Sequence, residues 1–66
     1  MTIGGRDFTG HAIDQMQARG IMPSVIEDTI RHGVESDGRD GARIFTTDQL
    51  KVILNSDGSV KAVIPQ

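Results

Sequence analysis

The chain has 66 residues, of which 36% are apolar and 24% charged, and its formal net charge is −2. This length fits one small domain that buries only about 60% of the surface exposed by its unfolded chain. The sequence contains no cysteine, which excludes disulfides, thiolate metal sites and thiol nucleophiles and favours folding in reducing cytosol. We find no apolar run near the roughly 20 residues that a membrane helix needs, and no secretory signal pattern.

The charge balance argues against a general nucleic-acid-binding surface. Seven basic residues stand against nine acidic ones, whereas non-specific binding of nucleic acid usually requires a basic excess. The chain also has no Tyr or Trp, the side chains on which bases commonly stack. An RNA site here would therefore be a local basic spot, or a partner would help to bring the substrate.

Residues 1–8 are expected to form a flexible lead-in from which Phe8 could dock on the domain. A first helix is predicted from the N-cap Thr9 to about Arg19, with Gly20 as its C-terminal stop. Its expected apolar face consists of Ala12, Ile13 and Met16.

A second helix follows, and two registers are open for its start. Pro23 suits the first helical position; alternatively, Ser24 caps the helix and Glu27 completes a capping box. Gly33 is expected to end this helix. Its apolar side recurs at three- and four-residue spacing and consists of Val25, Ile26, Thr29, Ile30 and Gly33.

Beyond Gly33 the hydrophobic period becomes that of strands. Strands are expected at 34–36, 42–46, 50–55 and 60–64, with an Asp-Gly hairpin signal before the last. In that strand Val60, Ala62 and Ile64 are expected to share one face, and the core is expected to consist of Ile, Val, Leu and Met. Two helices on a three- or four-stranded antiparallel meander predict a single α+β domain over residues 9–66.

The most informative feature is a polar stripe on the first helix. His11, Gln15 and Arg19 are spaced four residues apart, so a helix places them on one side. A histidine can move a proton near neutral pH, and an arginine can hold phosphate oxygens with two parallel hydrogen bonds. The stripe therefore indicates a site for a phosphodiester, with His11 and Arg19 in the reaction and Gln15 as a substrate contact.

The remaining polar candidates carry less weight. His32 is expected to favour the dipole at the end of the second helix, and Arg43 and Lys51 are expected on strands, where either could supply a second phosphate contact. The turn from Asp37 to Gly41 lacks the alternating oxygen ligands of a calcium loop. We expect neither a metal nor another cofactor.

The run GHAIDQMQARGIMPSVIE from Gly10 to Glu27 resembles the C-terminal toxin domains of contact-dependent growth inhibition proteins and related bacterial polymorphic toxins. The closing segment VILNSDGSVKAVIP from Val52 to Pro65 is similar to the end of those domains. The resemblance covers most of residues 8–66 and is weaker from Val34 to Gln49.

That resemblance implies a metal-independent ribonuclease of the barnase, colicin and RelE class. It implies RNA, often transfer RNA, as the target, a cognate immunity protein as inhibitor, and delivery from an attacking bacterium into the cytoplasm of the target cell. It leaves open whether a host factor takes part. By motif position, His11 and Arg19 are the catalytic candidates.

One position departs from the family pattern. Relatives often have a threonine where this chain has Ala62, and that hydroxyl is a suspected part of the active site. Ala62 marks either natural divergence or a disarmed toxin. The alternative to a ribonuclease is a non-catalytic protein-interaction module or an inactive relative of the toxin, which the acidic charge and Ala62 favour.

Overall fold

The computed structural model describes residues 2–3 and 5–66. An N-terminal pair of short strands comes first, then two helices, and then a four-stranded antiparallel sheet in the order β3-β4-β5-β6. The elements are β1 (Thr2–Ile3), β2 (Arg6–Asp7), α1 (Gly10–Arg19), α2 (Pro23–His32), β3 (Val34–Asp37), a 3-10 turn η1 (Arg39–Gly41), β4 (Arg43–Thr46), β5 (Leu50–Leu54) and β6 (Val60–Pro65). The predicted α+β architecture is confirmed.

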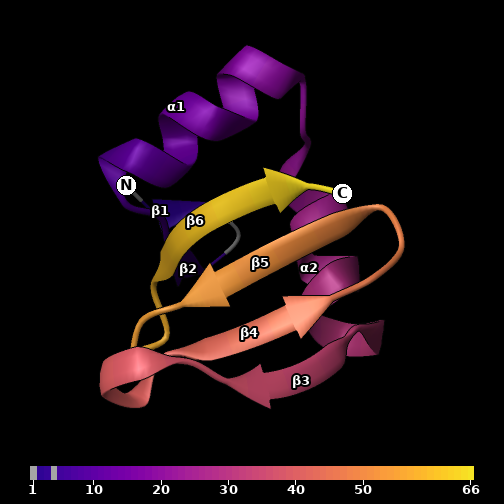
Figure 1. The fold of residues 1–66 in the computed structure, drawn as a ribbon. Coiled ribbons are helices and arrows are strands. Elements are labelled where there is room, and N and C mark those ends of the chain that lie inside the picture. The colour runs from indigo at the N-terminus through magenta and orange to yellow at the C-terminus, as the bar shows by residue number, and fades with distance from the viewer. Residues whose placement is uncertain (1, 4) are drawn as a thin grey trace.

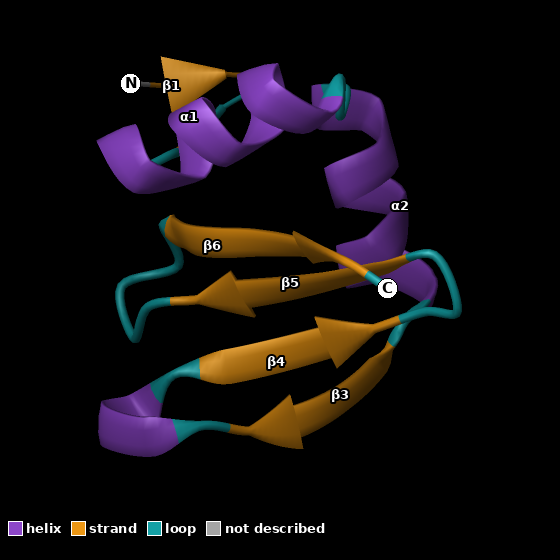
Figure 2. Cartoon of the chain, turned by 45° about the horizontal axis from the view of Figure 1, so that its top comes forward, coloured by secondary structure: helices purple, strands orange, loops and turns teal. Residues whose placement is uncertain are grey.

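The two helices occupy different places around the sheet. α2 packs behind β4 and β5, whereas α1 runs beside β6 at the end of the sheet (Figures 1 and 2). Within the described chain no helix covers the other side of the sheet. We call this side the open face; by strand register it comprises Val34, Ser36, Ile44, Thr46, Lys51, Ile53, Ala62 and Ile64.

Residues in the sequence explain where both helices begin and where α1 ends. The Thr9 side chain accepts a hydrogen bond from the Ala12 N–H at 3.1 Å and so caps α1. Gly20 ends α1 at φ 66°, the left-handed region that glycine tolerates. For α2, the structure selects the register with Pro23 in the first turn: Met22 is the N-cap and no side chain caps the helix.

Gly33 follows the last residue of α2 at a position where its neighbours leave no room for a side chain. A Cβ there would run into the Thr29 carbonyl oxygen and stand 3.1 Å from the Thr46 backbone nitrogen. The chain can therefore turn directly from α2 into β3 while staying close to β4.

The expected face assignment of the last strand is correct in placing Ala62 and Ile64 together and wrong in placing Val60 with them. The pairing of β5 with β6 shifts register beside Lys61, which is an extra residue on β6, as in a β-bulge. Val60 and Val63 consequently both face the core at 0% exposure, while Ala62 and Ile64 lie on the open face. Simple alternation cannot anticipate such an insertion.

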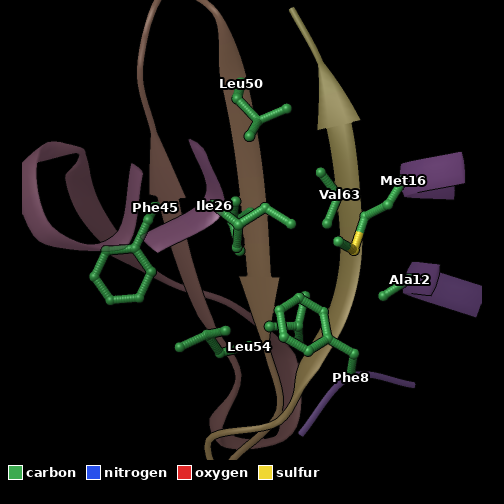
Figure 3. Close-up of a cluster of buried hydrophobic side chains, with 10 residues drawn as sticks. Phe8, Ala12, Met16, Ile26, Phe45, Leu50, Leu54 and Val63 are labelled. Carbon is green, nitrogen blue, oxygen red and sulfur yellow. The ribbon is translucent and has the colours of Figure 1, made fainter. Parts of the chain in front are cut away.

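The core contains both phenylalanines, contrary to the expectation that it is wholly aliphatic. Phe8 is 3% exposed and Phe45 7% exposed, and each packs with aliphatic side chains from the helices and strands (Figure 3). The structured part of the chain also begins earlier than the expected boundary at Thr9. Arg6, in the segment expected to be a lead-in, pairs with Glu27 of α2.

Candidate functional site

The first helix is fixed to the free edge of β6 by three hydrogen bonds. The Thr9 N–H donates to the Val60 carbonyl at 3.0 Å, and its hydroxyl donates to the Lys61 carbonyl at 3.1 Å. Six residues further along the chain, Gln15 Oε1 accepts from the Val63 N–H at 2.8 Å. The helix therefore supplies the hydrogen-bond partners that a further strand would otherwise provide.

This docking leaves a shallow groove between α1 and the end of β6. Its volume is about 330 Å³, and it is lined by His11, Asp14, Gln15, Ala18, Arg19, Val63, Ile64 and Pro65. The helix supplies every polar side chain, and β6 supplies a wall of apolar residues. The structure thus places the whole predicted stripe of His11, Gln15 and Arg19 on one groove.

Helical spacing sets the stripe, and docking on β6 determines which of its members is partly buried. His11 and Arg19 are exposed, while Gln15 between them is half-buried against the strand. The bond from Val63 uses the carbonyl oxygen of the Gln15 amide and not its nitrogen. The two N–H donors of the Gln15 amide are therefore not used in this bond, and Gln15 lines the groove together with His11 and Arg19.

Asp14 also lines the groove, and the sequence analysis did not select it. Residues three apart on a helix are neighbours, so the signal for Asp14 was its position three residues after His11. The groove thus combines a titratable base, a carboxylate and a permanent cation on about two turns of one helix.

Two other candidates lie on the neighbouring open face instead of in the groove. Lys51 pairs across the strands with Ile64, one of the residues that line the groove. Ala62 pairs with Ile53, is 9% exposed and does not line the groove. A threonine at position 62 would therefore add its hydroxyl beside the groove wall and not at its centre.

Arg43 and His32 are not brought to the groove. Arg43 lies on β4, two strands away from β6, and its Nε is 3.6 Å from Glu35 Oε2 in an exposed ion pair. His32 lines a separate cavity of about 420 Å³ at the end of α2, with Asp28 and Asp48 among its neighbours. We therefore leave both out of the candidate site.

A cavity of about 570 Å³ is lined by Arg6, Glu27 and Asp57 with their neighbours and is a structural junction. In it the Arg6 guanidinium donates to Glu27 Oε1 at 2.7 Å and to the Gly58 carbonyl at 3.3 Å, which ties the N-terminal segment to α2 and the β5–β6 turn. The Ser59 hydroxyl and N–H both donate to the Asp57 carboxylate and lower its pKa. Arg6, Glu27 and Asp57 thus all take part in hydrogen bonds within the fold, and we do not select this cavity as the candidate site.

Among residues 2–3 and 5–66 no three histidine or acidic side chains are grouped so as to hold a metal ion. No helix in that part of the chain has the length and apolar character to cross a membrane. Comparisons with protein-family models, curated proteins and solved structures found no match. The assignment of function therefore depends on the chemistry of the groove and on the sequence resemblance.

Proposed function

We propose that this chain is an antibacterial toxin domain that cleaves RNA without a metal ion, with transfer RNA as the substrate. The groove between α1 and β6 is its active site. Its partner besides RNA is a cognate immunity protein, and it acts in the cytoplasm of a target cell after delivery from an attacking bacterium. The resemblance of Gly10–Glu27 to toxin domains supports the biological setting.

The observation that carries the enzymatic part is the joint presence of His11 and Arg19 on one groove. RNA contains its own nucleophile, the 2′-hydroxyl, so an enzyme needs only proton transfer and stabilisation of charge on phosphorus. His11 can transfer a proton, a contribution of about 10²–10⁴ in rate. Arg19, with the Gln15 N–H donors, can bind the phosphate oxygens as their negative charge grows.

Incubation of the purified domain with total RNA in EDTA tests this proposal. We expect cleavage with 2′,3′-cyclic phosphate and 5′-hydroxyl ends, concentrated in transfer RNA. The His11→Ala and Arg19→Ala variants should each cleave at least about 100-fold more slowly. The Ala62→Thr variant is assayed in parallel, because that position lacks the hydroxyl found in relatives.

The second helix offers matched controls for both substitutions. His32 and Arg31 are exposed on α2 and lie outside the groove, so their alanine variants should cleave like the parent chain. Loss of activity in EDTA, full activity of His11→Ala, or no cleavage by either the parent or Ala62→Thr would each contradict the proposal.

A second candidate is a non-catalytic interaction module, and the open face favours it. Val34 and Ile64 on this face are 74% and 38% exposed, and no helix covers them within the described residues. Expression of the Ala62→Thr variant in bacteria separates the two functions. Growth arrest that an immunity protein relieves supports the toxin, and harmless expression supports the module.

A further inference from the structure

The groove contains two side chains that can exchange protons with a substrate. His11 and Asp14 both line it, whereas the Arg19 guanidinium stays protonated and can only donate hydrogen bonds. No titratable residue enters from the strand side, where Val63, Ile64 and Pro65 form the wall. On the neighbouring strands the charged residues are the cations Lys51, opposite Ile64, and Lys61, at the β6 bulge.

Cleavage of RNA by its own 2′-hydroxyl needs two proton transfers at opposite sides of phosphorus. A base removes the 2′-hydroxyl proton while the bond from the 2′-oxygen to phosphorus forms. The bond from phosphorus to the 5′-oxygen then breaks, and an acid gives a proton to that oxygen. The products are a 2′,3′-cyclic phosphate and a 5′-hydroxyl, so one group ends with a proton gained and the other with a proton lost.

We propose that Asp14 is the base and His11 the acid of this reaction, an inference that depends on the proposed ribonuclease function. Asp14 accepts the 2′-hydroxyl proton on its carboxylate, and the protonated His11 imidazole gives its proton to the departing 5′-oxygen. Exchange with solvent then returns both groups to their starting states. Gln15 and Arg19 hold the phosphate between them.

The spacing and exposure of the two residues support this division. Side chains three residues apart on a helix have Cβ atoms about 5–6 Å apart, so the two groups can reach different oxygens of one phosphate. Asp14 and His11 are both exposed, so a substrate can reach either side chain. A carboxylate has only acceptor oxygens, which suits the base, and a protonated imidazole has two N–H donors, which suits the acid.

The pH–rate profile is the first test. The parent chain should give a bell-shaped profile, because the base must be deprotonated and the acid protonated. The Asp14→Asn variant should lose at least about 100-fold in rate and lose the acid limb of the profile. His11→Ala should lose the alkaline limb instead, and Asp28→Asn on α2, which is exposed outside the groove, should behave like the parent.

A leaving-group experiment then separates the two roles. RNA with sulfur in place of the bridging 5′-oxygen at the mapped cleavage site releases a thiolate, which departs without an added proton. His11→Ala should cleave this substrate within a few-fold of the parent, whereas Asp14→Asn should stay slow. Circular dichroism of each variant confirms that it is folded.

Three outcomes overturn this inference without touching the proposed function. In the first, the parent cleaves RNA and Asp14→Asn keeps its rate and both limbs of the profile. In the second, the thiolate substrate rescues Asp14→Asn and not His11→Ala, which reverses the roles. In the third, it rescues neither variant, so His11 is not the acid. A parent chain and an Ala62→Thr variant that both fail to cleave RNA contradict the proposed function itself.

Discussion

Gln15 connects the groove to the sheet. Its carbonyl oxygen accepts the hydrogen bond of the Val63 N–H, which lies on the free edge of β6. A backbone N–H that is left without a hydrogen-bond partner lowers the free energy of unfolding by about 1–3 kcal/mol when water does not take the partner's place. Gln15 also lines the groove, so one side chain both stabilises the fold and belongs to the proposed substrate site.

Removal of this side chain should destabilise the domain selectively. Gln15→Ala is expected to lower the free energy of unfolding by about 1–2 kcal/mol, because the Val63 N–H loses its acceptor. Gln17→Ala is the control, since Gln17 is exposed on the same helix and its substitution changes only helix propensity. Urea unfolding followed by circular dichroism measures both.

The Gln15→Glu variant separates the two uses of the side chain. Glutamate keeps an oxygen for Val63 but replaces the donating nitrogen with negative charge, so stability should be retained while RNA cleavage falls. Equal unfolding of Gln15→Ala and Gln17→Ala would show that the bond contributes nothing.

The elements of the fold are held by short-range features that the sequence displays. Thr9 caps α1, Gly20 ends it, and Pro23 begins α2. The junction of α2 and β3 differs, because it depends on a close approach between segments distant in sequence. There Gly33 lies against backbone atoms of α2 and β4.

Adding a methyl group at Gly33 should lower the stability of the domain. Gly33→Ala is expected to destabilise the domain by about 1–3 kcal/mol, because the neighbours are backbone atoms that cannot move aside independently. Gly10→Ala is the control: Gly10 is the first residue of α1, and nothing lies within 4 Å of its would-be Cβ, so the change should be neutral or slightly stabilising. Thermal unfolding compares them, and equal losses would exclude a steric cause.

The α+β class and the bounds of the two helices and of the four-stranded sheet, to within a residue or two, could be predicted from the sequence because caps, glycines and hydrophobic periods are local signals. The strands β1 and β2 in the expected lead-in could not. The stripe of His11, Gln15 and Arg19 could also be predicted, since helical spacing alone sets it. The bulge at Lys61 and the place of Asp14 beside the β6 wall could not. Both depend on tertiary contacts between segments, and the residue pattern within one segment does not predict such contacts.

At the scale of the whole molecule, the N-terminal segment belongs to the fold. Phe8 is 3% exposed in the core and bridges to Val60 of β6, and Arg6 joins the same segment to Glu27. A domain of this length has a total stability of about 3–10 kcal/mol. The burial of one large side chain therefore contributes a considerable share of this total stability.

Phe8→Ala should leave the domain largely unfolded at room temperature. The expected loss is about 3–5 kcal/mol, the range for phenylalanine-to-alanine changes in cores. Phe8→Leu keeps most of the apolar volume and should remain folded with a smaller loss. Heteronuclear NMR spectra of the two variants would decide it: well-dispersed amide signals from Phe8→Ala would mean that the segment is dispensable.

The docking of α1 has a consequence for self-association. Thr9 and Gln15 occupy the Val60 and Lys61 carbonyls and the Val63 N–H on the outer edge of β6, and Pro65 has no N–H to offer. At the opposite edge of the sheet, no strand among residues 2–3 and 5–66 lies beyond β3, which is exposed along its length. Another chain can therefore extend this sheet only by pairing with β3. If two copies pair through their β3 strands about a twofold axis, both free edges are used and association stops at the dimer.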